Sequence, residues 1–150
     1  MPPTTERVFV DTNVLVYARD LRTPDKRARA RAWLAELDAR ADPRINLQVL
    51  NELTRWLLAQ KGHSAEAARA ELEAFAIWGD QPIGPDEVEI AWIVRERLGY
   101  QWFDCLLLAS AHLQGCRTFL SEDMTHGATF EGLTLVNPFR LSPDEFFQRN

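Results

Sequence analysis

The sequence predicts one α/β/α domain, in which helices flank a mostly parallel, twisted sheet of four to five short strands. Short apolar runs alternate with longer segments of helical periodicity, and this alternation favours right-handed crossovers between parallel strands. The hydrophobic fraction of 46% and the charged fraction of 26% are ordinary for a single globular domain. No repeat, low-complexity segment or interior linker divides residues 1–150, which we therefore expect to form one domain.

The first half of the sequence predicts two strands and four helices. Thr23 is expected to cap the long second helix, with Pro24 at its first position, and Ser64 the fourth. The expected segments are a loose arm at 1–6, a strand at 8–10, a short helix at 13–19, a helix from Pro24 to Ala41 stopped by Asp42 and Pro43, a weak strand at 44–47, and helices at 48–60 and 65–78. The inward positions are Ala30, Trp33, Leu34, Leu37 and Ala41 in the second helix and Val49, Leu50, Leu53, Trp56 and Leu57 in the third.

The second half predicts further helices and the remaining strands. A minimal strand is expected at Ile83, and the helix that Pro85 opens is expected to end before Gly99 and to be buried through Val88, Ala91, Trp92 and Leu98. The next helix, 102–113, is apolar almost all round and should be deeply buried. Strands are expected at 117–120 and 133–136, followed by a short final helix whose capping box runs from Ser142 to Glu145.

The cysteine content and the lack of long apolar segments indicate a cytoplasmic protein. No long apolar segment opens the chain and no 18-residue apolar run occurs, which argues against secretion and against a membrane span. Cys105 and Cys116 lack the spacing of a metal site or disulfide framework.

The net charge is −5, yet the stretch from Arg19 to Arg31 holds six basic and two acidic residues. This stretch could contact phosphates or form a solvated helix face, and the sequence leaves both open.

Four acids fall at equivalent places in the predicted elements. Asp11 and Asp123 follow strands, whereas Glu52 and Asp104 lie near the beginnings of helices. In an open α/β sheet these ends share one edge, so the four side chains are expected to converge there. The alternative is that each acid merely caps a helix or forms a turn. We favour convergence because Glu52 and Asp104 adjoin strongly apolar segments, where an unpaired carboxylate is costly.

Converging carboxylates repel one another unless a cation neutralises them. Oxygen ligands suit Mg²⁺ or Mn²⁺, and such an ion can activate water and neutralise charge on a phosphoryl group. The predicted chemistry is therefore metal-assisted hydrolysis of a phosphodiester.

Several segments resemble one known family. The matching segments are 10–17 (VDTNVLVY), 50–52 (LNE), 102–109 (WFDCLLLA), 115–123 (GCRTFLSED) and 136–139 (VNPF). In this order and at these spacings the chain resembles PIN-domain ribonucleases, specifically the VapC-type toxins of type II toxin–antitoxin systems. The resemblance implies a PIN-like fold and a Mg²⁺-dependent endoribonuclease, in which Mn²⁺ can substitute.

The family's acidic quartet carries over onto Asp11, Glu52, Asp104 and Asp123. The resemblance implies that Asp11 and Asp104 bind the metal directly, and that Glu52 and Asp123 act through water, one of them helping to deprotonate the attacking water. Glu122 adjoins Asp123 and competes with it for the fourth position, although the family register favours Asp123.

The resemblance also implies supporting residues and partners. Thr12, Asn13 and Ser121 match positions that hydrogen-bond to the acids and orient them. Relatives form homodimers and are silenced by a small antitoxin. The expected partners are therefore an RNA substrate, a second copy of the chain, and a VapB-type antitoxin in a hetero-oligomer, with no membrane.

The RNA path and two rival functions stay open at this point. His126 could contact RNA or simply be a loop residue, and the basic candidates for the path are Arg19, Arg22, Lys26, Arg27 and Arg55. One rival is a PIN-like protein that binds nucleic acid without cutting it. The other is a receiver-type signalling domain, which would need a late lysine, whereas no lysine follows Lys61.

Overall fold

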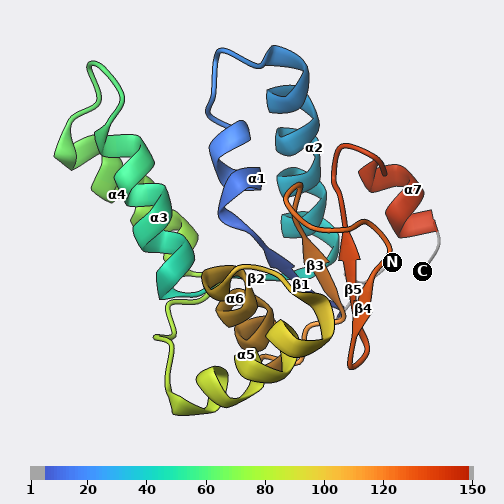
Figure 1. The fold of residues 1–150 in the computed structure, drawn as a ribbon. Helices are drawn as coiled ribbons and strands as arrows, with labels where there is room; N and C mark the ends of the chain where they lie inside the picture. The colour runs from blue at the N-terminus through green and yellow to red at the C-terminus, as the bar shows by residue number, and fades with distance from the viewer. Residues whose placement is uncertain (1–5, 149–150) are drawn as a thin grey trace. The chain divides into compact units, whose positions relative to one another are not determined.

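The computed structural model describes residues 6–148 and divides the chain into two compact units (Figure 1). Unit 1 comprises Met1–Pro43 and Cys116–Asn150, and unit 2 comprises Arg44–Gly115. The arm expected at 1–6 lies, apart from Glu6, outside the described residues. The α/β class is confirmed, because the chain forms one five-stranded, mostly parallel sheet together with seven helices over residues 6–148.

The sheet has the strand order β2-β1-β3-β5-β4 and belongs to unit 1, except that the last residue of β2 falls in unit 2. Strands β1 and β3 are parallel, as are β3 and β5, whereas β4 runs antiparallel to β5. The register pairs Val10 with Leu120 and Leu120 with Val136, so three neighbouring strands end side by side. The strand bounds are β1 Arg7–Val10, β2 Asp42–Arg44, β3 Thr118–Leu120, β4 Thr129–Phe130 and β5 Leu133–Val136.

The helices of unit 1 are α1 (Thr12–Tyr17), α2 (Pro24–Arg40) and α7 (Pro143–Gln148). Helix α2 buries Ala30, Trp33 and Leu37, whereas Leu34 and Ala41 are only half-buried. Thr23 is at the N-cap position but makes no side-chain capping bond. The capping box of α7 is confirmed, because the Glu145 N–H donates to Ser142 Oγ (3.1 Å) and the Ser142 N–H donates to Glu145 Oε1 (3.0 Å).

Unit 2 is built from helices that pack in pairs, α3 (Leu47–Leu58) on α4 (Ala65–Ala76) and α5 (Pro85–Leu98) on α6 (Trp102–Leu113). Side chains cap two of them: Asn46 Oδ1 accepts the Val49 N–H and Ser64 Oγ accepts the Ala67 N–H, both at 3.0 Å. Gly99 ends α5 in the left-handed region, with φ 74°. The predicted helices of this unit are thus all present, although α3 ends at Leu58 and α4 at Ala76.

Three strand predictions need correction. The second strand is β2, which spans Asp42–Arg44 and shares only Arg44 with the predicted residues 44–47; the Asp42 N–H donates to the Glu6 carbonyl (3.0 Å), and Leu47 already begins α3. Ile83 belongs to no strand; it lies in a loop, in which the Gln81 carbonyl accepts the N–H of Leu47, the first residue of α3 (3.0 Å). Strand β4 was not predicted, since two residues are too few to show a period of two.

The predicted buried face of α5 is also wrong in part. Ala91 and Val94 are buried, whereas Val88 is 36% and Trp92 59% exposed. The Trp92 ring instead lies against the ring of Trp102, with centroids 4.6 Å apart. The burial predicted for α6 is confirmed for its middle, since residues 105–111 are all buried, but Leu113 at its end is 46% exposed.

Cys105 and Cys116 are free, buried thiols. Burial raises the pKa of the Cys105 thiol, whose Sγ lies 3.4 Å from the Tyr100 carbonyl oxygen. Cys105 is therefore a packed core residue and not a nucleophile. Over residues 6–148, none of the helices has the length and apolar character needed to cross a bilayer.

Candidate active site

The ends of β1 and β3 bring Asp11 and Ser121 together in unit 1. Because Val10 pairs with Leu120, the next residue of each strand steps off the sheet at the same edge. Asp11 is 4% exposed; its Oδ1 accepts the Thr12 N–H (2.7 Å) and its Oδ2 accepts the Ser121 hydroxyl (2.8 Å). The carboxylate is thus both the N-cap of α1 and fixed to the neighbouring strand.

Asn13 joins this pair to a second acid. Its Nδ2 lies 3.2 Å from Asp11 Oδ2, 3.0 Å from Ser121 Oγ and 3.1 Å from Asp123 Oδ2. Its Oδ1 accepts the N–H of Glu122 (3.2 Å), which fixes the turn that carries Asp123. Two of the four predicted acids, Asp11 and Asp123, therefore share one amide donor. Asn13 is neutral, so it holds these carboxylates without cancelling their charge.

Glu122 faces a different partner, the ammonium group of Lys26. Lys26 Nζ also lies over the rings of Tyr17 and Phe139, 4.7 and 5.1 Å from their centroids. The hydrogen bond to Glu122 is the main cause that raises the pKa of Lys26, and a hydrogen bond to Glu122 likewise raises the pKa of Tyr17. The two adjacent acids are thus separated, since Glu122 contacts a cation and Asp123 contacts the Asn13 amide.

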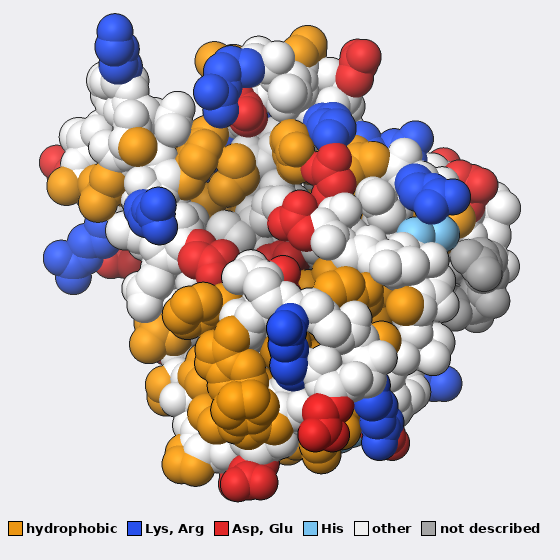
Figure 2. All heavy atoms as spheres, in the orientation of Figure 1, with side chains coloured by type: hydrophobic (Ala, Val, Ile, Leu, Met, Phe, Trp, Pro, Cys, Tyr) orange, Lys and Arg blue, Asp and Glu red, His pale blue; other side chains and the backbone are white. Residues whose placement is uncertain are grey.

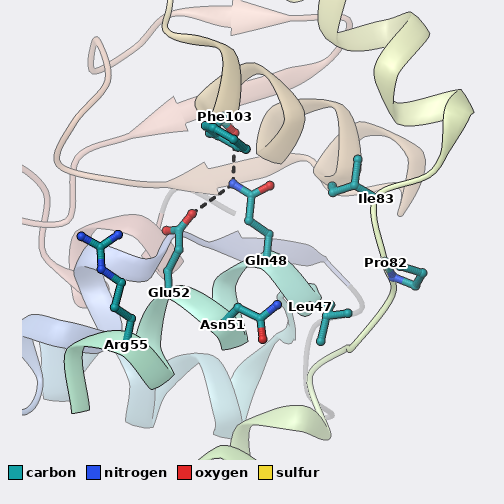
Figure 3. A pocket seen from close by; sticks show the side chains of 8 residues that line it. All are labelled: Leu47, Gln48, Asn51, Glu52, Arg55, Pro82, Ile83 and Phe103. Atoms are coloured by element: carbon teal, nitrogen blue, oxygen red, sulfur yellow. Dashed lines mark hydrogen bonds between the residues drawn. The ribbon is translucent and has the colours of Figure 1, made fainter. Parts of the chain in front are cut away.

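In unit 2, Gln48 connects Glu52 to the beginning of α6. Gln48 Nε2 lies 3.0 Å from Glu52 Oε1, one helical turn further along α3, and 3.3 Å from the carbonyl oxygen of Phe103 (Figure 3). The residue after Phe103 is Asp104, which is half-buried in the first turn of α6. One neutral amide therefore links the acid of α3 to the turn that bears the acid of α6.

A hollow of about 460 Å³ opens beside Glu52, within unit 2. Arg55 and Glu52 lie on one side of it and Leu47, Pro82 and Ile83 on the other, with Asn51 between them, while Phe103 lies beside Gln48 (Figure 3). Its lining residues are Leu47, Gln48, Asn51, Glu52, Arg55, Pro82, Ile83 and Phe103.

Sequence reasoning missed three of these lining residues, Gln48, Asn51 and Phe103. The four-residue spacing of Gln48 and Glu52 on one helix was a usable signal, because such pairs face each other.

Hydrophobic side chains also gather on the surface over α5 and the beginning of α6 (Figure 2), where Trp92, Ile93 and Phe103 are exposed.

The donor chemistry of both pairs fits a hard divalent cation. Among residues 6–148, neither unit holds a group of three or more acidic, histidine or cysteine side chains placed to bind a metal ion. Each unit holds two of the four predicted acids, and neutral amides hold the side chains of three of them. Carboxylate oxygens fixed in this way are the ligands that Mg²⁺ and Mn²⁺ prefer. The prediction that all four acids share one ion stays a prediction.

Part of the basic stretch is engaged in ion pairs. Arg22 holds Asp20 through Nε (3.0 Å) and Nη2 (3.1 Å), and these hydrogen bonds lower the pKa of Asp20. Lys26 pairs with Glu122. The imidazole of His126 accepts the N–H of Asn137 at Nδ1 (3.0 Å), which ties its loop to the residue after β5.

Comparison with known proteins identifies the family. The model of the PIN domain family matches residues 8–126, a span that includes all four acids. No curated protein sequence matches the chain.

Several solved structures are similar to this one. A toxin–antitoxin complex from Klebsiella pneumoniae has a TM-score of 0.62 at 21% identity, covering 87% of this chain and 97% of that chain. VapBC2 from Rickettsia felis, bound to a promoter DNA fragment, has a TM-score of 0.62 at 18% identity, covering 87% and 98%. VapC20 from Mycobacterium tuberculosis, a sarcin–ricin loop cleaving toxin, has a TM-score of 0.52 at 21% identity, covering 75% and 86%. At these identities the similarity establishes the fold, and together with the match over residues 8–126 it confirms the resemblance to PIN domains: the chain belongs to the PIN domain family.

Proposed function

We propose that the protein is a Mg²⁺-dependent endoribonuclease and the toxin of a type II, VapBC-type toxin–antitoxin pair. The observation that carries this proposal is the sharing of Asn13 by Asp11 and Asp123, in a chain that belongs to the PIN family. Two carboxylates held close together at the end of a parallel sheet repel each other, which lowers the stability of the fold. Such an arrangement is expected where both acids bind the same cation.

The four acids would hold the ion in two ways. Asp11 and Asp104 would be its direct ligands, and Glu52 and Asp123 would act through water. Mg²⁺, or Mn²⁺ in its place, would supply an activated water and neutralise charge on the phosphoryl group. The remaining steps belong to the chain: Asn13 and Ser121 orient Asp11 and Asp123, Gln48 orients Glu52, and Glu52 or Asp123 accepts a proton from the attacking water.

The contacts of Glu122 support Asp123 as the fourth acid. The Lys26 ammonium neutralises Glu122, while the Asp123 carboxylate lies at the amide that also holds Asp11. A carboxylate already paired with a lysine is a poorer ligand for a cation.

The partners follow from the same family. The complexes from Klebsiella pneumoniae and Rickettsia felis are toxin–antitoxin assemblies, and the latter holds promoter DNA. We propose a VapB-type antitoxin as partner, a homodimer within a larger toxin–antitoxin complex, and a cytoplasmic location. The RNA substrate is supported by VapC20, a sarcin–ricin loop cleaving toxin of similar fold.

The rival function is a PIN protein that binds RNA without cutting it. The exchange Asp104→Asn separates the two, because it keeps the shape of the side chain and removes its charge. We expect purified wild-type protein to cleave RNA with Mg²⁺ or Mn²⁺, and Asp104→Asn to reduce the rate at least a hundred-fold with an unchanged circular dichroism spectrum. Cleaved RNA is mapped by sequencing the new ends.

A matched control is Asp80→Asn, which removes the charge of an exposed loop acid in the same unit and should leave the rate unchanged. A folded Asp104→Asn variant with full activity would contradict the acidic quartet. A wild-type protein that binds RNA but never cleaves it would favour the rival.

A further inference from the structure

We infer that the hollow beside Glu52 binds one unpaired nucleotide of the RNA substrate, with its base against Phe103 and its phosphate at Arg55. The inference rests on the proposed nuclease function and adds to it a specificity site within unit 2. A nucleotide combines a flat, largely apolar base with a charged phosphate, and the hollow likewise combines apolar side chains with a charged arginine. The volume of about 460 Å³ falls in the usual range of small-molecule sites, roughly 300–1,000 Å³.

The Phe103 ring offers a platform for stacking. Phe103 lines the hollow and is 60% exposed, and Leu47, which lines it on the side of Pro82 and Ile83, is 39% exposed (Figure 3). An exposed phenylalanine ring beside a cavity is the surface on which proteins stack unpaired bases, and every base can use it because each has a π face. A base paired within a duplex has no free face to present there.

The polar side chains supply an edge contact and a charge contact. The two N–H groups of the Gln48 amide point to Glu52 and to the Phe103 carbonyl, so Gln48 has no donor left for a ligand. Asn51 is exposed, lines the hollow and offers both a donor and an acceptor to a base edge. Arg55 lies one turn beyond Asn51 on α3, where its guanidinium group can bind a phosphate oxygen.

Gln48 fixes the platform relative to an acid of the proposed active site. The same Nε2 atom lies 3.3 Å from the Phe103 carbonyl and 3.0 Å from Glu52 Oε1. A base stacked on Phe103 is therefore held at a set distance from Glu52, and Asp104 follows Phe103 directly in the chain. Cleavage should accordingly occur next to an unpaired base.

The test is binding of a six-nucleotide single-stranded RNA that contains 2-aminopurine, whose fluorescence falls on stacking. Full-length protein is titrated in Ca²⁺ without Mg²⁺. Phe103→Leu keeps an apolar side chain but removes the flat face, and we expect it to weaken binding about ten-fold and to abolish the fluorescence change. Arg55→Gln should weaken binding and reduce its dependence on salt, because one phosphate contact is lost.

Two matched controls lie outside the hollow in the same unit. Trp92→Leu removes an equally exposed aromatic ring, 59% against 60% for Phe103. Arg69→Gln removes an exposed arginine of α4. Both should bind within about two-fold of wild type. The inference is overturned if Phe103→Leu binds like wild type, if Trp92→Leu loses as much affinity, if duplex RNA competes as well as single-stranded RNA, or if the single-stranded RNA does not bind.

Cleavage assays on the same variants separate this inference from the nuclease proposal. Wild-type cleavage together with unchanged binding and KM for Phe103→Leu would leave the nuclease standing and remove the nucleotide site. Weakened binding of Phe103→Leu in a protein that never cleaves RNA would leave the nucleotide site standing and remove the nuclease.

Discussion

Asn13 shows how one side chain can set the geometry of a site. Its amide group has two hydrogens, and three oxygens lie within 3.2 Å of the nitrogen: Asp11 Oδ2, Ser121 Oγ and Asp123 Oδ2. The hydrogens are therefore shared, and removing the amide leaves two carboxylates facing each other without a common donor. Sequence spacing placed Asn13 near Asp11, but it could not show that one amide reaches both strand ends.

Removing this amide should cost stability. We expect Asn13→Ala to lower the free energy of unfolding by about 1–3 kcal/mol, because a partly buried network loses its central donor. Urea unfolding in the absence of divalent ions measures the change. Asn51→Ala, which truncates an exposed asparagine of unit 2, should leave the unfolding free energy within about 0.5 kcal/mol of wild type. Equal unfolding free energies of the two variants would show that the Asn13 amide does not stabilise the folded protein.

At the scale of elements, helix α2 is fixed to the C-terminal part of unit 1 by Trp33. This side chain is fully buried, and its Nε1–H lies 2.9 Å from the Pro138 carbonyl and 3.1 Å from that of Leu141. The ring also packs against Phe146 of α7, with centroids 5.3 Å apart. One indole thus joins α2, the loop after β5 and α7.

Trp33→Phe should destabilise the protein by about 2–4 kcal/mol. The exchange removes the only donor of an indole ring, leaves two buried carbonyls without it, and creates a small cavity. The midpoint of guanidinium unfolding measures the effect, and the exposed Trp92→Phe is the control. A change below 0.5 kcal/mol for Trp33→Phe would mean that α2 and α7 are held by other contacts.

The elements differ in how well sequence could predict them. Strand β1 is a short apolar run and helix α3 has clear helical periodicity, so both were predicted within two residues, and the capping box predicted where α7 begins. Helix α5 carries apolar side chains on more than one side, and only packing against α6 decides that Ala91 and Val94, and not Trp92, are buried. The acids could be predicted from strand ends and helix beginnings. The spacing of Gln48 and Glu52 was also a usable signal, whereas the role of Phe103 could not be predicted, because it depends on a contact between α3 and α6.

For the whole molecule, the proposal that both units supply ligands to one ion predicts a link between metal and stability. An ion that binds only the folded chain raises its melting temperature, and 100-fold excess over Kd is equivalent to about 2.7 kcal/mol. We expect Mg²⁺ to raise the melting temperature of the wild type and a chelator to reverse the shift.

The variants Asp11→Asn from unit 1 and Asp104→Asn from unit 2 should each abolish this shift, while Asp80→Asn keeps it. Differential scanning calorimetry with and without Mg²⁺ measures it. If only the Asp11 variant loses the response, unit 1 binds the ion alone and the quartet is wrong.

The sheet also restricts how a partner can bind. One edge strand, β2, contains Pro43, which has no N–H to donate, and the other, β4, is only two residues long. Among residues 6–148, both edges are therefore poor templates for an added strand, which disfavours recognition of a partner by strand addition. We expect an antitoxin or a second copy to bind through side-chain surfaces, where affinity depends on individual residues and few substitutions suffice to change the partner.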